Sequence, residues 1–154
     1  MTSSEFEQND MASRQEGLSE ICNDHDELRD LLHEIQERLA KRLGTVARVT
    51  ETLADFCDVL ERHFSAEEIG GFFDEILERE PQLTESVEAV KADHTKLREA
   101  IQRLLRASSD ERHSDWWEEM ERSFKEFSRT LMKHEQAERQ LLFEAYWQDS
   151  PAQD

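Results

Sequence analysis

Hydrophobic residues recur along most of the chain at alternating spacings of three and four, the period of an amphipathic helix. Four such stretches are separated by Gly44, by Gly70-Gly71 with Pro81, and by the polar stretch 108–114. They predict long helices over about 18–43, 46–69, 82–107 and 115–147, with a short apolar piece at 72–77. A single long coiled coil is the competing interpretation, but each break falls between complete apolar seams. The pattern therefore predicts an all-α protein, an antiparallel up-down-up-down four-helix bundle.

The polar ends of the chain lack this periodicity. Residues 1–16 predict a flexible tail, residues 17–148 the bundle, and residues 149–154 a frayed C-terminus. A length of 154 residues suits one domain.

Charge and cysteine content narrow the possible partners and the compartment. A formal net charge of -18 disfavours binding to nucleic acid or to an anionic membrane. No stretch approaches the roughly 20 apolar residues of a membrane span, and the N-terminus has no secretion signal. Cys22 and Cys57 are expected to lie too far apart along the bundle for a disulfide. Free thiols and the missing signal predict a cytoplasmic protein.

Each of the four apolar seams is interrupted by one histidine. The second and fourth seams also carry a glutamate four residues further on. The six interruptions are His25, His63, Glu67, His94, His134 and Glu138. Residues four apart on a helix are neighbours, so a histidine and a glutamate at this spacing can bind a common metal centre.

A single seam histidine is ordinarily a core histidine bonded to a polar neighbour, so one such residue proves little. A buried carboxylate without a partner costs several kcal/mol. Six polar side chains facing one core are therefore expected to need a compensating cation. Imidazole and carboxylate together suit iron, manganese or zinc. Because a carboxylate can bridge two ions, four imidazoles and two carboxylates suit a symmetric pair of metals.

The chain also repeats these motifs. The Asp-His-x-x-Leu-Arg motif at 24–29 recurs at 93–98, and the His-x-x-x-Glu motif at 63–67 recurs at 134–138. Chance similarity between helices rich in Glu and Leu is the competing explanation. Two matches at nearly equal offsets, both centred on histidines, favour two similar helix pairs instead.

In order and spacing, these motifs resemble those of the hemerythrin-like, or HHE cation-binding, family over about residues 18–147. The resemblance implies a non-haem di-iron centre that binds or reacts with dioxygen, peroxide or nitric oxide. It implies two iron ions (Fe2+/Fe3+) with an oxo or hydroxo bridge. The metal ligands that it implies are His25, His63, Glu67, His94, His134 and Glu138.

Two departures from oxygen-carrying hemerythrins affect the expected activity. Where those proteins have a further histidine, one turn after the third-helix ligand, this chain has Arg98. Where they end on an aspartate, this chain has Arg139, and Glu138 takes its place. Six ligands instead of seven favour a reactive or sensory protein over a reversible carrier. Peroxidase- or oxidase-like activity, a metal-dependent oxygen or iron sensor or partner-binding module, and iron storage stay open.

Several residues near these motifs receive other interpretations. His33 is expected on a flank of the bundle, and His113 in a solvated loop. Glu68 and Glu135 follow ligands directly, so they point about 100° away and are predicted to be solvated. Arg98 cannot ligate a metal and is expected to turn to the flank and reach carboxylates or water.

Overall fold

The computed structural model describes residues 5, 8, 25–110 and 114–146. Within these ranges the chain is helical and contains no strand, as the all-α prediction requires. The elements are the first helix (25–41), α2 (Val46–Ile69), α3 (Phe72–Arg79), the 3-10 turn η1 (Pro81–Leu83), α4 (Thr84–Ser108) and α5 (Trp116–Tyr146). The predicted tail (apart from residues 5 and 8) and the predicted frayed end at 149–154 lie outside the described residues.

Helix boundaries follow local sequence signals closely. Both predicted ends of α2 are confirmed, and α3 extends two residues beyond the predicted piece, to Arg79. The first helix ends before its predicted limit because Arg42 and Gly44 adopt positive φ angles of 51° and 81°. Thr45 then caps α2, since its side-chain oxygen accepts a 3.1 Å hydrogen bond from the backbone N–H of Arg48. Ser108 belongs to α4 and not to the predicted loop.

Two adjacent glycines let the chain turn from α2 into α3. Gly71 has a φ of 79°, in the left-handed region that costs other residues strain. A Cβ on Gly70 would lie 2.3 Å from the carbonyl oxygen of Ala66, closer than a side-chain carbon can approach. Both positions therefore require glycine, for different reasons.

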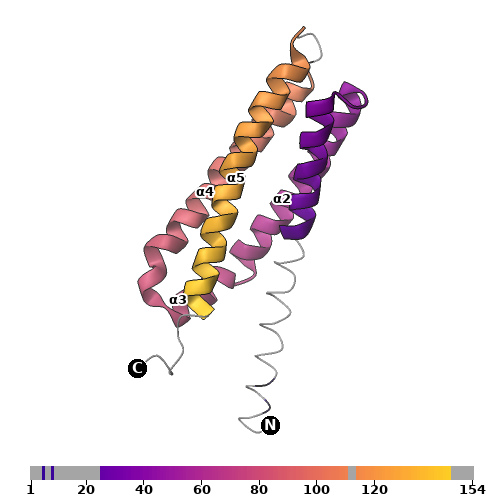
Figure 1. Cartoon of the computed structure of the whole chain (residues 1–154). Coiled ribbons are helices and arrows are strands. Elements are labelled where there is room, and N and C mark those ends of the chain that lie inside the picture. Colours follow the sequence, from indigo (N-terminus) through magenta and orange to yellow (C-terminus); the bar gives the residue numbers. More distant parts are fainter. Residues whose placement is uncertain (1–4, 6–7, 9–24, 111–113, 147–154) are drawn as a thin grey trace.

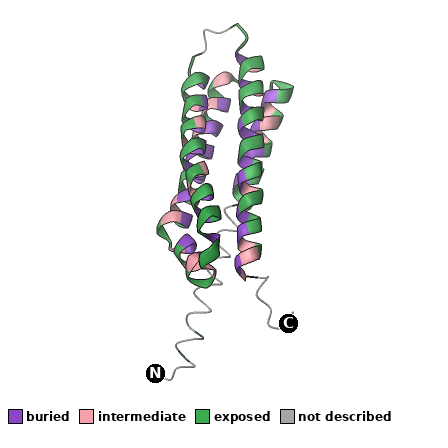
Figure 2. Ribbon diagram, turned by 90° about the vertical axis from the view of Figure 1, so that its left-hand side faces the viewer, coloured by how far each residue is buried: buried purple, intermediate pink, exposed green. Residues whose placement is uncertain are grey.

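The four long helices lie side by side, and α3 lies at the end of the molecule where α2 and α5 finish (Figure 1). Contacts join α2 to α4 and α4 to α5. Buried residues line the inner faces of these helices, and exposed residues cover the outer faces (Figure 2). This arrangement is compatible with the predicted four-helix bundle.

The apolar core consists of two clusters separated by the polar seam positions. The larger cluster includes Phe56, Leu97 and Leu131, and the smaller one includes Val90 and Leu141. On α4 and α5 the seam histidines and Glu138 fall between the residues of the two clusters. The smaller cluster also contains Phe72, Phe73 and Ile76 of α3, from the short apolar piece predicted at 72–77. A polar layer is therefore enclosed by apolar side chains along the bundle axis.

Outside this layer, the described residues bear on the expectations about the cysteines and about a membrane span. Cys57 is a buried free thiol, and burial raises its pKa to about 11. Cys22 lies outside the described residues, so the prediction about a disulfide stays a prediction. Among the helices of the structure, none has the length and apolar character that crossing a membrane requires.

Candidate metal centre

The polar layer brings together all six residues predicted to hold metal. The side chains of His63, Glu67 and His94 are fully buried, and those of His134 and Glu138 are exposed by only 1%. His25, at the start of the described part of the first helix, is exposed by 12%. Each long helix contributes one imidazole, and α2 and α5 each add the carboxylate one turn further on. Whether these residues bind metal stays a prediction, but their convergence is a fact of the fold.

Glu138 lies at the centre of the layer and faces histidines on two sides. Its Oε1 atom lies 2.6 Å from Nε2 of His134 and 3.2 Å from Nε2 of His94. Its Oε2 atom lies 3.2 Å from Nε2 of His25 and 3.7 Å from Nε2 of His63. One carboxylate thus separates two pairs of imidazoles, with one oxygen directed to each pair.

Glu67 occupies a similar position from the opposite side of the layer. Its Oε1 atom contacts Nε2 of His63, and its Oε2 atom lies 3.5 Å from Nε2 of His94. Both oxygens are buried, and neither has hydrogen-bond geometry with any partner; the same is true of Nε2 of His134. Buried polar atoms without hydrogen bonds are rare in folded proteins and point to a missing partner. A cation, or a pair of cations, between the two carboxylates would satisfy all three atoms.

Two groups of side chains could each hold an ion, because their ligand atoms lie within 4.8 Å of one another. One group is His94, His134 and Glu138, and the other is His25, His63, Glu135 and Glu138. The donor set of imidazole nitrogens and carboxylate oxygens fits iron, manganese or zinc. Sharing of Glu138 between the groups fits two ions held close together.

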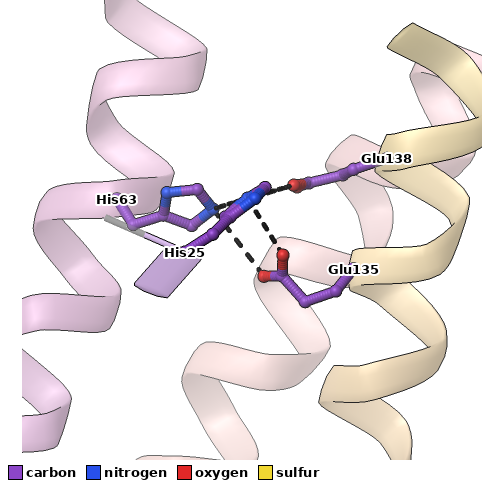
Figure 3. Close-up of side chains that lie close together, drawn as sticks. All are labelled: His25, His63, Glu135 and Glu138. Atoms are coloured by element: carbon purple, nitrogen blue, oxygen red, sulfur yellow. Dashed lines mark hydrogen bonds and ion pairs between the residues drawn. The ribbon is translucent and has the colours of Figure 1, made fainter. Parts of the chain in front are cut away.

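The prediction that Glu135 is solvated is wrong. This carboxylate reaches from α5 toward the first helix, where its Oε2 atom lies 2.9 Å from Nε2 of His25 (Figure 3). It points about 100° away from the core seam, as expected, but that direction faces a neighbouring helix and not water. A glutamate directly after a seam histidine is the sequence signal that could have indicated this.

The prediction is only partly correct for Glu68, since 29% of its side chain is exposed but the carboxylate also contacts His94 of α4. Nδ1–H of His94 donates a 3.0 Å hydrogen bond to Oε1 of Glu68, so Nε2 of His94 faces the polar layer. In the same way, Nδ1–H of His134 donates to Oδ2 of Asp93 at 3.3 Å. Carboxylates that accept from the outer ring nitrogen fix the tautomer and orientation of ligating histidines.

Arg98 turns to the flank and reaches carboxylates, as predicted. Its Nη1 and Nη2 atoms donate to the two oxygens of Glu68, each at 2.9 Å, and its Nε atom donates to Glu61 at 2.7 Å. The guanidinium also lies 5.4 Å from the centre of the Phe64 ring. Arg98 therefore holds Glu68, and Glu68 in turn holds His94. His33 is exposed, as predicted, whereas His113 lies outside the described residues.

The charges of the metal-free site depend on burial and on these contacts. Burial raises the pKa of Glu67 to about 9, so this carboxyl is neutral at pH 7. Burial disfavours ionised Glu138, but the close approach of four histidines, with His134 the nearest, outweighs it and holds the pKa of Glu138 well below its usual range. Burial also lowers the pKa of His25 and of His94, but hydrogen bonds to carboxylates, Glu138 among them, raise both to about 9. Without metal, protons thus take the place of cations.

The Glu68→Gln variant is expected to weaken metal binding about 10- to 100-fold, the usual effect of losing a carboxylate behind a ligating histidine. A neutral amide accepts a weaker bond from His94 and no longer attracts Arg98. Competition with a chromophoric chelator measures the affinity. Glu61→Gln is the matched control, because Glu61 pairs with Arg98 but is not a partner of His94. Equal metal affinity in the two variants would contradict a positioning role for Glu68.

Comparison with known proteins agrees with this geometry. The family described as the hemerythrin HHE cation binding domain matches the chain over residues 16–105 and again over residues 85–154. No curated protein matches the chain, and no solved structure does. The two overlapping matches together include every histidine and glutamate of the polar layer.

Proposed function

The chain belongs to the hemerythrin HHE cation-binding family, and on this basis we propose that it is a di-iron protein which binds or reacts with dioxygen, peroxide or nitric oxide. In this proposal the metal ligands are the predicted six: His25, His63, Glu67, His94, His134 and Glu138. We further propose the antiparallel up-down-up-down topology of a four-helix bundle and a cytoplasmic location.

The observation that carries the proposal is the position of Glu138. A carboxylate with each oxygen directed to a different pair of histidines suits a bridge between two ions. A single ion would use one pair and leave the other pair of inward-facing imidazoles without a metal ion. Glu67 supports the same conclusion, because its two oxygens also face His63 and His94 separately.

Iron supplies the chemistry that the side chains lack, since a pair of reduced ions can bind and donate electrons to dioxygen, peroxide or nitric oxide. The protein side chains determine what surrounds the metal ligands. Phe64 stacks on His94 with ring centres 3.9 Å apart, and Phe73 lies 5.8 Å from the same ring. The two apolar clusters limit the access of water from either end of the bundle. Asp93 and Glu68 hold the outer nitrogens of His134 and His94.

Mixing the reduced, iron-loaded protein with air, hydrogen peroxide or nitric oxide tests this function. Stopped-flow absorption should show a rapid reaction with at least one of the three, and none with protein loaded with zinc instead. Repeated additions of peroxide then separate an enzyme from a stoichiometric binder. An iron-loaded protein that reacts with none of the three would contradict the proposal.

The Arg98→His variant is expected to slow the decay of the absorption that develops when dioxygen is added. The imidazole would lie one turn after His94 and could supply a seventh ligand, as in oxygen carriers. Arg98→Met is the matched control, because it removes the same contacts with Glu61 and Glu68 without adding an imidazole. A long-lived, reversible oxygen complex in the unmutated protein would instead restore the interpretation as a carrier.

A further inference from the structure

We propose that Glu135 is an additional, displaceable donor to the ion held by His25 and His63, and that a small anion entering from the adjacent cavity must displace it. This inference rests on the proposed di-iron function and concerns a residue outside the six predicted ligands. It assigns to Glu135 the control of ligand access to one half of the centre.

The contacts of Glu135 indicate a donor. Its Oε2 atom lies 2.9 Å from Nε2 of His25, and its Oε1 atom lies 3.8 Å from Nε2 of His63 (Figure 3). Oε1 is buried and has no hydrogen bond, although 14% of the whole side chain is exposed. A buried carboxylate oxygen without a donor group is costly unless a cation is close. An ion between these two imidazoles would be that cation.

Glu135 makes the two halves of the centre unequal. Glu138 and Glu67 face both halves, whereas Glu135 lies beside the half with His25 and His63 and adds a carboxylate there. The additional donor thus lies on the opposite half from Arg98, which takes part in ion pairs beside His94.

A small cavity lies beside Glu135, between the first helix and α5. It has a volume of about 20 Å³, enough for roughly one water molecule or a comparably small ligand. Leucines from both helices form its apolar walls, and His25 and Glu135 line it directly. Arg29 and Arg139 also line it, and two guanidinium groups favour an anion over a neutral or cationic ligand.

The half of the centre with His94 is covered by aromatic rings and by an ion pair. The rings of Phe64 and Phe73 pack on His94, and Glu68 and Arg98 cover its outer nitrogen. A ligand in the cavity therefore meets Glu135 before it meets any other acidic side chain of the polar layer. Because a donor carboxylate and an incoming anion compete for one position, removing the carboxylate should help the anion bind.

Metal binding tests the first half of this inference. Glu135→Gln keeps the size of the side chain but removes its charge, and it is expected to weaken the binding of one of two Mn2+ ions at least about tenfold. The affinity for the other ion should stay unchanged. Glu126→Gln is the matched control, since Glu126 is an exposed glutamate on the same helix, outside the polar layer. Circular dichroism of both metal-free variants checks that the helices are retained.

Azide binding to the oxidised, iron-loaded protein tests the second half. Glu135→Ala should bind azide at least roughly tenfold more tightly than the unmutated protein, the effect of about 1.4 kcal/mol of lost competition. Glu126→Ala should not. If the unmutated protein binds two ions and both Glu135 variants behave like their Glu126 controls, Glu135 is not a donor and only this inference fails. If the unmutated protein does not bind two ions, the proposed function itself fails.

Discussion

Replacing Glu138 with glutamine is expected to prevent binding of the metal pair and to destabilise the metal-free protein by about 3 kcal/mol or more. Each oxygen of Glu138 is directed to both members of a different pair of histidines, whereas each oxygen of Glu67 faces a single histidine. An amide has one oxygen and cannot bridge two ions in the same way. In the metal-free protein Glu138 is also the counter-ion of the protonated histidines, and its loss leaves those buried charges uncompensated.

Glu67→Gln is expected to destabilise the metal-free protein less than Glu138→Gln does. Burial raises the pKa of Glu67 to about 9, so at pH 7 the metal-free protein already holds it as a neutral acid. Glutamine should therefore cost the metal-free protein little, while still weakening metal binding. The same argument does not extend to Glu138, because four histidines surround its carboxylate.

Thermal unfolding of both variants without metal measures the difference. At roughly 2–4 °C for each kcal/mol, the Glu138→Gln variant should melt about 10 °C lower than Glu67→Gln. Chelator competition on the same samples measures the loss of metal affinity. Equal melting temperatures, or two ions bound normally by Glu138→Gln, would show that Glu138 is neither counter-ion nor bridge.

Removing metal with a chelator is expected to lower the melting temperature, and to lower it more at pH 8.5 than at pH 6.5. Binding of a ligand only to the folded state stabilises it by about 4 kcal/mol when the free ligand is 1,000 times Kd. Ligands must lose their protons to bind metal, so this stabilisation grows as the pH rises.

The stability of the metal-free protein should instead fall as the pH rises. The pKa values of His25 and His94 are raised from 6.5 to about 9, so their stabilising effect is complete below pH 6.5 and is lost as the pH rises to 9. The pKa of Glu67 is raised from 4.5 to about 9, so Glu67 also keeps a proton in the folded state that the unfolded state releases. Its effect on the stability of the metal-free protein therefore has the same sign. The difference between loaded and metal-free protein must therefore widen with pH.

Differential scanning calorimetry with and without chelator at the two pH values checks this prediction. Adding the chelator to protein already stripped of metal is the control and should change nothing. A metal-free form as stable as the loaded one at both pH values would contradict coupling between metal binding and folding.

Much of this architecture follows from the sequence because the apolar seams are nearly complete. The 3-4 rhythm places one histidine of each helix on the core face, and Gly44 separates His25 and His63 by equal lengths of helix. For His94 and His134 the lengths of helix to the intervening loop are unequal, since His94 lies nearer the loop. Their ring centres are nevertheless 4.8 Å apart.

The surroundings of the core face could not be predicted in the same way. A helical period shows that Glu135 points sideways, but not which helix lies on that side or how close it comes. The approach of the first helix places His25 against Glu135, and the position of α4 places His94 against Glu68. Reasoning from one helix at a time therefore missed the histidine contact of each glutamate, whereas the expectation for Arg98 required only that carboxylates lie nearby.

The number of metal ions per chain distinguishes a di-iron centre from a site for a single ion. The protein is reconstituted with Fe2+ without oxygen, desalted, and analysed for metal and for protein concentration, and an absorption spectrum is recorded in air. We expect close to two iron ions per chain, because the oxygens of Glu138 and those of Glu67 are directed to separate histidines. A reproducible single ion at full occupancy, for example one zinc in the protein as purified that iron does not replace, would contradict it.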